Sequence, residues 1–529
     1  MERSELEIAV KPRGCNPWAS SVCRRWVSLL EIAGVFAMFF VQGAWPVPDV
    51  NEPYYLGKAL HFWNPHWAAG DFFLNTADSH KVFYMAFGWL SLWLSLPVLA
   101  WVGRILTWAL LAAAWQRLSM AAVPRRWFSL LTAGLFVLLL DRCQMAGEWV
   151  IGGVEAKGFA FVLVFLGLAE LIDGRWRRVW PLLGAAAAFH VLVGGWSLVA
   201  AGIAWLLSPT RPPLRSMAPG LALGFLFSLP GLIPSLMLNW GTPAAIVTEA
   251  DKIYCYGRLL HHLVPLRLPP EYLLRFAGLA VAWLILSRFV RGNAGLRRLS
   301  GFVLGALVLL VIGFLLNCVA LLPACEARAA GWLKLYWFRL SDVAVPLGAA
   351  LMSAGWIADL LDAGSVAKAR LGVGLLILAI GGGSFQLGSR LTEWNAPPRS
   401  MEDEVDPVAW RQACTWVAQS GKIPADACFI TPDESETFKW FAHRAEVVNR
   451  KEIPQDARSI VQWWRRRWEI HSIDGTEDSG WFATLADAGV DRLKKMGAKY
   501  HAGYVITVAA PRLDLPVAYE NGAYIIYRL

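Results

Sequence analysis

The chain has 529 residues, of which 56% are hydrophobic and only 17% are charged, and its mean hydropathy is +0.44. This composition excludes a water-soluble globular protein, a disordered chain and a collagen-like repeat. Eight cysteines are too sparse for a disulfide-stapled secreted scaffold. The net charge of +9 lies in the hydrophobic part of the chain, where basic residues report membrane orientation, so nucleic-acid binding is not expected. The sequence predicts a membrane protein.

Apolar stretches that fit a bilayer recur along the first three quarters of the chain. A helix needs about 20 apolar residues to cross about 30 Å of hydrocarbon. Such stretches lie at 27–45, 97–118, 126–142, 157–172, 217–238, 272–290, 300–322, 338–361 and 371–388. The run 179–207 is too long for one span and too short for two, and Gly194-Gly195 divides it, so we expect a broken or re-entrant pair. The short run 82–96 is expected to lie along the membrane surface.

Basic residues orient these spans. With a cytoplasmic N-terminus, the inner connections are about three times richer in Lys and Arg than the outer ones, as the positive-inside rule requires. The first apolar run has no small-residue cleavage site, and we expect it to be a retained span rather than a removed signal peptide. About 11 passages, counting the broken pair as two, then place the C-terminus outside. We therefore predict a multi-pass protein of the inner (cytoplasmic) membrane with a periplasmic C-terminal part.

The same patterns divide the chain into three parts. We expect a cytoplasmic segment at 1–26, a multi-pass transmembrane helical bundle at 27–388 whose outer loop 46–96 carries the candidate site, and a soluble extracytoplasmic α/β domain at 389–529. In that domain the periodicity predicts strands at 427–431, 445–449 and 503–509 and helices at 434–442, 457–470 and 481–496. Asn521-Gly522 predicts a hairpin turn. Cys414 and Cys428 are expected either to pair in an oxidising compartment or to be buried free thiols.

Two acids close to the first span are the first candidates for chemistry. Asp49 and Glu52 lie in a loop rich in Trp, Phe and Tyr, which we interpret as a membrane-hugging cap over a site. The alternative for this pair is a proline-bounded helix start, where acids interact favourably with the helix dipole.

Further ionisable residues lie at the outer ends of later spans. Glu155 and Lys157 begin an apolar span, where ionisable groups are costly and are either paired or functional. A simple ion pair between them is the alternative. His190 lies in the broken segment, where a lone histidine is more often a packing residue.

The third and fourth outer loops add more cationic and imidazole groups, namely Arg258, His262, Lys334 and Arg339. A guanidinium fork suits phosphate oxygens, so the cations at the outer boundary are candidate ligands of a lipid phosphate. Arg339 and Asp342 are three residues apart, and they alternatively neutralise each other on one helix face. Glu155 or a histidine is a candidate ligand of a divalent metal, although no tight ligand spacing supports one.

This arrangement resembles the GT-C superfamily of integral-membrane glycosyltransferases. The shared features are a cytoplasmic N-terminus, a long first outer loop with an acid near the first span, a second acidic outer loop, irregular middle helices and a soluble outer C-terminal domain. The first-loop acid corresponds to Asp49 or Glu52, and the second to Glu148 or Glu155; the Asp-x-Asp or Asp-Glu pair of many members is absent. The segments NEPYYL at 51–56, GGVEAKG at 152–158 and TPDESETFKW at 431–440 also resemble an uncharacterised bacterial multi-pass family, which implies no activity.

The resemblance implies transfer of a sugar from a polyprenyl-phosphate lipid to an unknown extracytoplasmic acceptor. Asp49 or Glu52 is then expected to be the base, and the substrate is expected to contact Glu155, Lys157, His190, Arg258, His262, Lys334 and Arg339. The alternatives are a lipid or glycolipid transporter or flippase and a non-enzymatic envelope scaffold. Against a transporter, the halves show no internal repeat, and the polar residues gather at the outer boundary rather than at the midplane.

Overall fold

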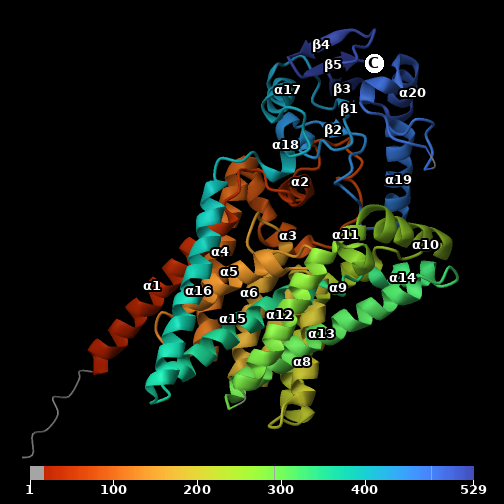
Figure 1. The fold of residues 1–529 in the computed structure, drawn as a ribbon. Helices are drawn as coiled ribbons and strands as arrows, with labels where there is room; N and C mark the ends of the chain where they lie inside the picture. Colours follow the sequence, from red (N-terminus) through yellow and green to blue (C-terminus); the bar gives the residue numbers. More distant parts are fainter. Residues whose placement is uncertain (1–16, 291, 478) are drawn as a thin grey trace, which may run out of the picture.

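A bundle of long helices carries a smaller α/β domain at one end (Figure 1). The computed structural model describes residues 17–290, 292–477 and 479–529, so residues 1–16 of the expected cytoplasmic segment lie outside the described residues. We call the end of the bundle that carries the α/β domain the domain end, and the opposite end the far end.

All nine expected spans are helices: α1 (Pro17–Gly43), α4 (Leu96–Ala122), α5 (Phe128–Cys143), α6 (Ala156–Ile172), α9 (Leu214–Met237), α12 (Pro270–Phe289), α13 (Ala294–Ala320), α15 (Arg339–Leu361) and α16 (Val366–Thr392). Among the described residues, 7 helices are long and apolar enough to cross a membrane. The prediction of a mainly helical, multi-pass membrane protein is confirmed.

The expected break in the run 179–207 exists, but its predicted position is wrong. Helix α7 (Trp176–Phe189) ends and α8 (Val191–Leu207) begins at His190, and not at Gly194-Gly195. The His190 ring accepts the backbone N–H of Val193 at 3.4 Å and so caps α8. Gly194 serves a different purpose, because a Cβ there would lie 2.1 Å from the backbone nitrogen of Ala187 on α7. The glycine allows two short helices to pack closely.

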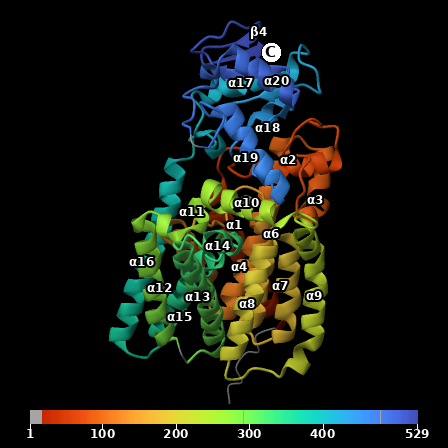
Figure 2. The same cartoon turned by 90° about the vertical axis from the view of Figure 1, so that its right-hand side faces the viewer.

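Short helices cover the domain end of the bundle (Figures 1 and 2). They are α2 (Glu52–Trp63), α3 (Lys81–Ala86), η1 (Gly88–Leu92), α10 (Ala244–Lys252), the π-helix η2 (Ile253–Arg258), α11 (Leu260–Leu263), η3 (Pro265–Arg267) and α14 (Glu326–Leu333). The run 82–96 therefore contains only short helical pieces before α4 and forms no span of its own.

The α/β domain contains a five-stranded sheet of order β2-β1-β3-β5-β4. Its elements are η4 (Arg399–Met401), α17 (Pro407–Gln419), β1 (Cys428–Ile430), α18 (Phe438–Ala442), β2 (Ala445–Glu446), α19 (Ala457–His471), η5 (Leu485–Ala488), α20 (Val490–Tyr500), β3 (Tyr504–Val508), β4 (Val517–Glu520) and β5 (Tyr524–Arg528). Strand β1 is parallel to β2 and β3, whereas β5 is antiparallel to β3 and β4. The hairpin at Asn521-Gly522 is confirmed. The single helix expected over 481–496 is wrong, because Trp481 forms a bridge with Ser472 before η5 and α20 begin.

The sheet separates two apolar cores. Ile525 and Tyr527 of β5 face one core, while Tyr524 and Ile526 face the other, as the alternation of side chains along a strand requires. Cys428 belongs to the first core and Cys414 to the second. Both are buried, and neither is in a disulfide among the described residues.

The loop 46–96 is part of the α/β domain's core as well as of the bundle. Phe73 and Leu74 of this loop belong to the same buried cluster as Val447 and Ile430 of the domain. Asp71 accepts the backbone N–H of Glu446 at 3.1 Å. The expected cap over a site is thus fixed to the domain above it.

Candidate functional site

The first ion cluster, formed by Asp49, Glu52, Arg104 and Arg399, lies where the loop 46–96 meets α4 and η4. Arg399 donates to both carboxylate oxygens of Asp49 at 2.9 and 2.8 Å. Arg104 donates to both oxygens of Glu52, each at 2.7 Å. The backbone N–H groups of Val50 and Gly153 complete the partners of Asp49, and those of Asp49 and Val154 complete the partners of Glu52. Both acids are fully buried and fully hydrogen-bonded.

The pKa of Asp49 agrees with its contacts to Arg399. Burial alone would raise the pKa of Asp49, but the adjacent Arg399 guanidinium outweighs it and lowers the pKa below its ordinary value. Asp49 is therefore ionised at neutral pH, and it can accept a proton only if Arg399 moves away.

The second ion cluster consists of Glu148, Glu155, Lys157, His190 and Arg339. Glu148 lies 3.2 Å from the Nζ of Lys157 and 2.7 Å from the Nε of Arg339. Glu155 lies 3.5 Å from the same Lys157 nitrogen, and Arg339 is 3.2 Å from the Nε2 of His190. The structure thus brings together four of the predicted substrate-binding residues, from three separate stretches of the chain.

Glu155 is the least constrained acid of the two clusters. Its only hydrogen-bond and ion-pair partners among the described residues are Lys157 and the amide of Asn51, both at 3.5 Å. Burial raises the pKa of Glu155 above its ordinary value, although Lys157 counteracts this effect. A carboxyl group with a raised pKa and few partners is suited to accept and release a proton.

Trp149 joins the two clusters. The Nζ of Lys157 lies 4.2 Å from the centre of its ring, and the guanidinium of Arg399 lies 5.9 Å from it. A Cβ at Gly152 would come within 2.2 Å of this ring, and one at Gly153 would come within 2.9 Å of the Asp49 side chain. The two glycines let the loop 142–157 closely approach the Trp149 ring and the Asp49 side chain. The Trp149 ring therefore lies beside two cations, Lys157 and Arg399.

Residues of the α/β domain close the site from above. Gln455 contacts the Nδ1 of His80 at 2.9 Å and donates to the hydroxyl of Tyr54 at 3.2 Å. The His80 ring lies 5.5 Å from that of His190. Asp78 lies 3.1 Å from His80; burial would raise the Asp78 pKa, but His80 outweighs it and lowers the pKa to about 2. The second cluster therefore extends to the domain through histidines.

The structure places the remaining predicted residues outside the two clusters. Lys334 pairs with Asp251 at 2.6 Å. Arg258 donates to the backbone oxygen of Arg450 at 2.9 Å. His262 is hydrogen-bonded to the backbone oxygen of Ala146 at 2.6 Å, and burial lowers its pKa to about 3.

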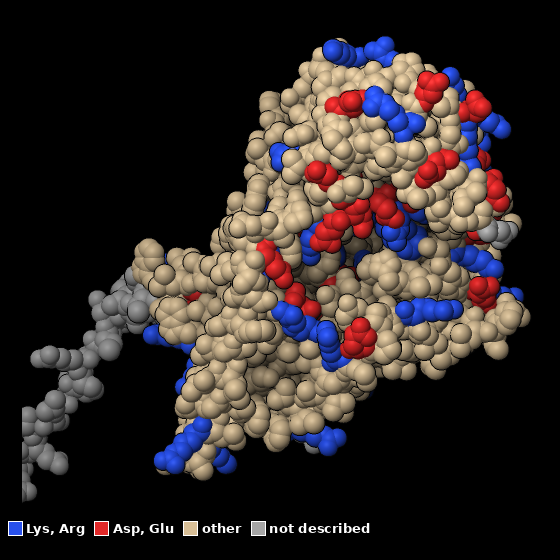
Figure 3. Space-filling view, turned by 45° about the horizontal axis from the view of Figure 1, so that its top comes forward, with Lys and Arg blue, Asp and Glu red and all other residues tan. Residues whose placement is uncertain are grey.

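Charged side chains surround a hollow between the bundle and the α/β domain (Figure 3). Burial lowers the pKa of Lys451 of the domain, and Glu436, Glu155 and Asp49 counteract this effect. Lys451 lies 3.8 Å from Glu436, whose pKa burial raises to about 7. The hollow gives the domain end an opening lined by both signs of charge.

Sequence reasoning missed Arg104 and Arg399. A signal for Arg104 was present, because a basic residue inside the apolar run 97–118 is costly without a partner. Arg399 lies in the polar linker after α16, where basic residues are common, and no signal in the sequence pointed to it.

The described ranges 17–290, 292–477 and 479–529 contain no group of three or more His, Cys, Asp and Glu residues that could hold a metal ion.

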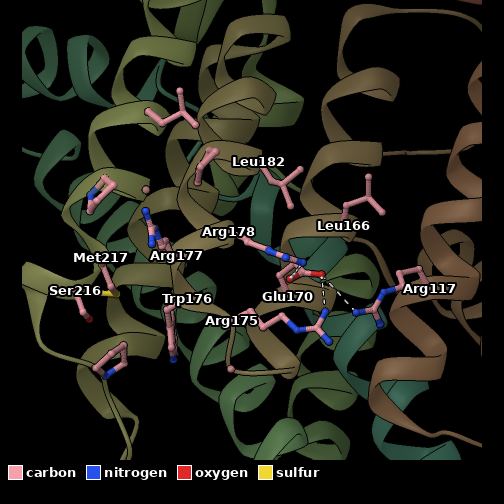
Figure 4. A pocket seen from close by; sticks show the side chains of 16 residues that line it. Arg117, Leu166, Glu170, Arg175, Trp176, Arg177, Arg178, Leu182, Ser216 and Met217 are labelled. Atoms are coloured by element: carbon pink, nitrogen blue, oxygen red, sulfur yellow. Dashed lines mark hydrogen bonds and ion pairs between the residues drawn. The ribbon is translucent and has the colours of Figure 1, made fainter.

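A separate cavity of about 1150 Å³ lies at the far end of the bundle, between α4, α6, α7 and α9. Figure 4 shows Glu170 at its centre, with Arg117 and Arg175 paired to it at 3.4 and 3.2 Å. Arg177 and Arg178 also line it, and leucines and prolines form its apolar wall. None of the residues predicted from the sequence as site residues lines this cavity.

One segment, which runs from α17 into α19, is similar to a described domain family. Residues 408–470 match a domain of unknown function, DUF6798. No curated protein matches the sequence.

Three solved oligosaccharyltransferase structures from the archaeon Archaeoglobus fulgidus, the first of them of AglB, are similar to this chain. The complex with an inhibitory peptide and a dolichol-phosphate is 11% identical, with 91% of this chain and 69% of that chain covered and a TM-score of 0.47. The apo form is 10% identical, with 93% and 70% covered and a TM-score of 0.45. The complex with Zn and sulfate is 12% identical, with 91% and 67% covered and a TM-score of 0.43. At such scores the similarity does not extend to an activity.

Proposed function

We propose that this protein is a membrane glycosyltransferase of the GT-C type, which moves a sugar from a polyprenyl-phosphate donor to an acceptor at the domain end. One observation carries the proposal: Glu155, Lys157 and Arg339 meet in a single buried cluster at the domain end of apolar helices. Acid and cations at the edge of a bilayer are the groups that such a transfer requires.

The cations are the proposed ligands of the donor phosphate. During transfer, the bond between the sugar carbon and the phosphate oxygen breaks, and negative charge develops on the departing polyprenyl phosphate. Lys157 and Arg339 both contact Glu148, which offsets one of their two positive charges. A phosphate that competes with Glu148 would gain a guanidinium and an ammonium together, in surroundings where charge interactions are strong.

Glu155 is the proposed base, in place of Asp49 or Glu52. A base must take the proton of the acceptor hydroxyl as that oxygen bonds to the sugar. Every oxygen of Asp49 and Glu52 already accepts two hydrogen bonds. Glu155 has weaker contacts and a raised pKa. In this scheme Asp49 and Glu52 hold the two loops in position, and Asp49 becomes reactive only if Arg399 is drawn away.

The proposed acceptor enters through the hollow between the bundle and the domain, on the periplasmic side of the inner membrane. We expect His190 and His80 to orient it, since His190 belongs to the second cluster and the His80 ring lies 5.5 Å from that of His190. A transporter is less consistent with these contacts, because both ion clusters lie at the domain end rather than halfway along the helices.

The test is a turnover assay on the purified full chain in detergent. Farnesyl-phosphate-linked mannose and glucose serve as donors, water serves as a surrogate acceptor, and released farnesyl phosphate is measured by mass spectrometry. We expect Glu155→Gln to lower the rate by about 10²- to 10⁴-fold and Arg339→Gln to raise KM. Arg125→Gln, at an exposed ion pair on the far end, is the control and should leave both unchanged. Full activity of the Glu155→Gln variant would refute the assigned base. Full activity of a Glu155→Gln/Arg339→Gln double variant would refute the site.

A further inference from the structure

A second cavity, with a volume of about 600 Å³, lies within the α/β domain itself. The loop that follows β1, at 432–435, and the loop that follows β3, at 509–510, both line it. Asp403 and Glu404 line it from the linker, and Trp481 and Phe482 from the segment after α19. It shares no lining residue with either ion cluster.

The topology of the sheet explains why a cavity forms here. Strand β1 lies between β2 and β3, and all three are parallel. The chain leaves β1 toward β2 on one side and then returns to β3 on the other side. The loops at the carboxyl ends of β1 and β3 therefore diverge, and a crevice at such a position is where open α/β sheets bind ligands.

Two buried polar atoms in this cavity lack partners. The Nε2 of His471 makes no hydrogen bond to the described residues, because Oδ1 of Asp433 is 3.9 Å away, beyond hydrogen-bond distance, and the His471 side chain is only 7% exposed. In the described part of the chain, Oε1 of Glu404 also makes no hydrogen bond, although the Ser435 side chain is close enough to lower the Glu404 pKa, whereas Oε2 accepts the hydroxyl of Tyr524 at 2.8 Å. Unsatisfied buried groups are uncommon and costly. Both residues line the cavity, so a bound ligand can satisfy both atoms.

The cavity is polar but has little free charge. Arg467 donates to Asp433 at 2.9 Å, and Arg450 donates to Glu434 at 2.8 Å, so two of its acids are already neutralised. Burial lowers the pKa of His471 to about 4, which keeps the imidazole uncharged at neutral pH. Burial also raises the pKa of Glu404 to about 7. These groups suit a neutral ligand with hydroxyl groups better than a phosphate or a polyamine.

Aromatic rings supply a flat apolar wall. Trp481 is 39% exposed, and its ring packs on that of Trp468 at 4.6 Å between centroids, which fixes its orientation. Phe482 and Tyr524 also line the cavity. A sugar ring presents apolar C–H groups on one face and hydroxyl groups at its edge, and this cavity offers a partner for each.

We propose that this cavity binds a neutral saccharide, with its hydroxyl groups on His471 and Glu404 and its ring face against Trp481. The volume is sufficient for one or two sugar rings, since ligand sites commonly measure about 300–1,000 Å³. This site is separate from the transfer site at Glu155 and does not depend on it, because binding here requires no donor lipid and no turnover.

Saturation-transfer NMR on the full chain in detergent tests the proposal, with free glucose, mannose, N-acetylglucosamine and maltose as probes. We expect at least one probe to bind saturably and Trp481→Ala to weaken that binding by about tenfold. Trp240→Ala, at a tryptophan that is 84% exposed and outside the cavity, is the matched control and should bind normally.

Glu404→Gln is the second variant, because it changes one atom and leaves the apolar core intact. It should weaken binding of the same probe while the protein still unfolds in one cooperative transition on heating. The proposal is overturned if no probe binds the unmodified chain, or if Trp481→Ala and Glu404→Gln both bind like the control. Preferential binding of spermidine or inorganic phosphate, lost in the same variants, would also overturn it. Full activity of the Glu155→Gln variant in the turnover assay would not count against this saccharide site, because binding here requires no turnover.

Discussion

Arg104 lies within an apolar helix, and Glu52 neutralises it. Both side chains are fully buried, and two hydrogen bonds of 2.7 Å join them. A buried pair of this kind adds little stability compared with apolar residues, but loss of one partner leaves an uncompensated charge. The pair therefore fixes the start of α2 against α4.

Substitution of Arg104 alone tests this role. Arg104→Met should destabilise the protein by about 3–5 kcal/mol, because Glu52 then stays buried without its cation. Thermal unfolding in detergent measures the effect. The exposed pair of Arg125 with Asp362 provides the control, and Arg125→Met should change stability by less than about 1 kcal/mol. Equal effects at the two positions would contradict the assignment.

His471 and Glu404 predict opposite pH dependences of stability in the α/β domain. The folded pKa of His471 is lowered to about 4, so the unfolded chain binds more protons between about pH 4 and 6.5, and the His471 contribution is lost as pH falls through this window. The folded pKa of Glu404 is raised to about 7, so its contribution is lost as pH rises toward 7.

Unfolding midpoints of single variants between pH 4.5 and 7 separate the two effects. Asp403, Glu436 and Tyr524 influence the pKa of Glu404, and Asp433, Arg467 and Arg492 influence that of His471. All six residues are unchanged in both variants. Relative to the unmodified chain, Glu404→Gln should gain stability as pH rises, and His471→Gln should gain stability as pH falls. If both variants gained stability in the same direction of pH change, the direction of the pKa shift of His471 or of Glu404 would be wrong.

At the scale of elements, the hairpin of α7 and α8 depends on one glycine of a neighbouring pair. A Cβ at Gly194 would lie 2.1 Å from the backbone of Ala187, whereas no described atom lies within 4 Å of a Cβ at Gly195. Gly194→Ala should therefore separate the two helices and displace His190 from Arg339.

The neighbouring glycine is the matched control. Gly195→Ala should be neutral or stabilising by up to about 1 kcal/mol, since alanine favours the helix. The thermal midpoint of each variant in detergent measures the difference. Equal tolerance of both substitutions would show that α7 and α8 do not pack as described.

The helices were more predictable than the break between two of them. Length and apolar composition are local properties, and they located the nine helices expected as spans, 7 of which are long and apolar enough to cross a membrane. They also located the hairpin at Asn521-Gly522. A Gly-Gly pair suggested a break, but Gly194 serves close packing, and the histidine before α8 provides the cap. Packing between helices does not appear in the periodicity of one helix, so the break was misplaced.

At the scale of the whole molecule, Lys439 joins the loop 46–96 to the α/β domain. Its ammonium lies 3.1 Å from Asp71 of the loop and 2.7 Å from Glu446 of the domain, and it also contacts Glu452. Burial alone would lower the Lys439 pKa, but these acids outweigh it and raise the pKa. Lys439 therefore remains charged, and it holds a loop and a domain in one unit.

Lys439→Met should loosen this unit, because three buried acids lose their common cation. We expect faster proteolytic cleavage within the loop 46–96 and in the linker before α17, measured on the full chain in detergent. Lys499→Met, at an exposed pair with Glu469, is the control. Identical cleavage rates in both variants would contradict the shared core.

The candidate site was predictable in part. Positions at the ends of spans identified Glu155, Lys157, His190 and Arg339, which meet in the second ion cluster. The same reasoning also selected Lys334, which pairs with Asp251 instead. The sequence pattern indicates how far along the bundle axis a residue lies, but it does not indicate which other helices or loops that residue contacts. Pairing between distant stretches, as between Asp49 and Arg399, therefore emerged only from the fold.

The most direct test of the central claim is the position of a lipid phosphate on the intact protein. A structure of the full chain in lipid nanodiscs with saturating farnesyl phosphate would locate it. We expect phosphate density between Lys157 and Arg339 at the domain end. Density only among Arg175, Arg177 and Arg178 in the far-end cavity, or none at the second ion cluster, would contradict it.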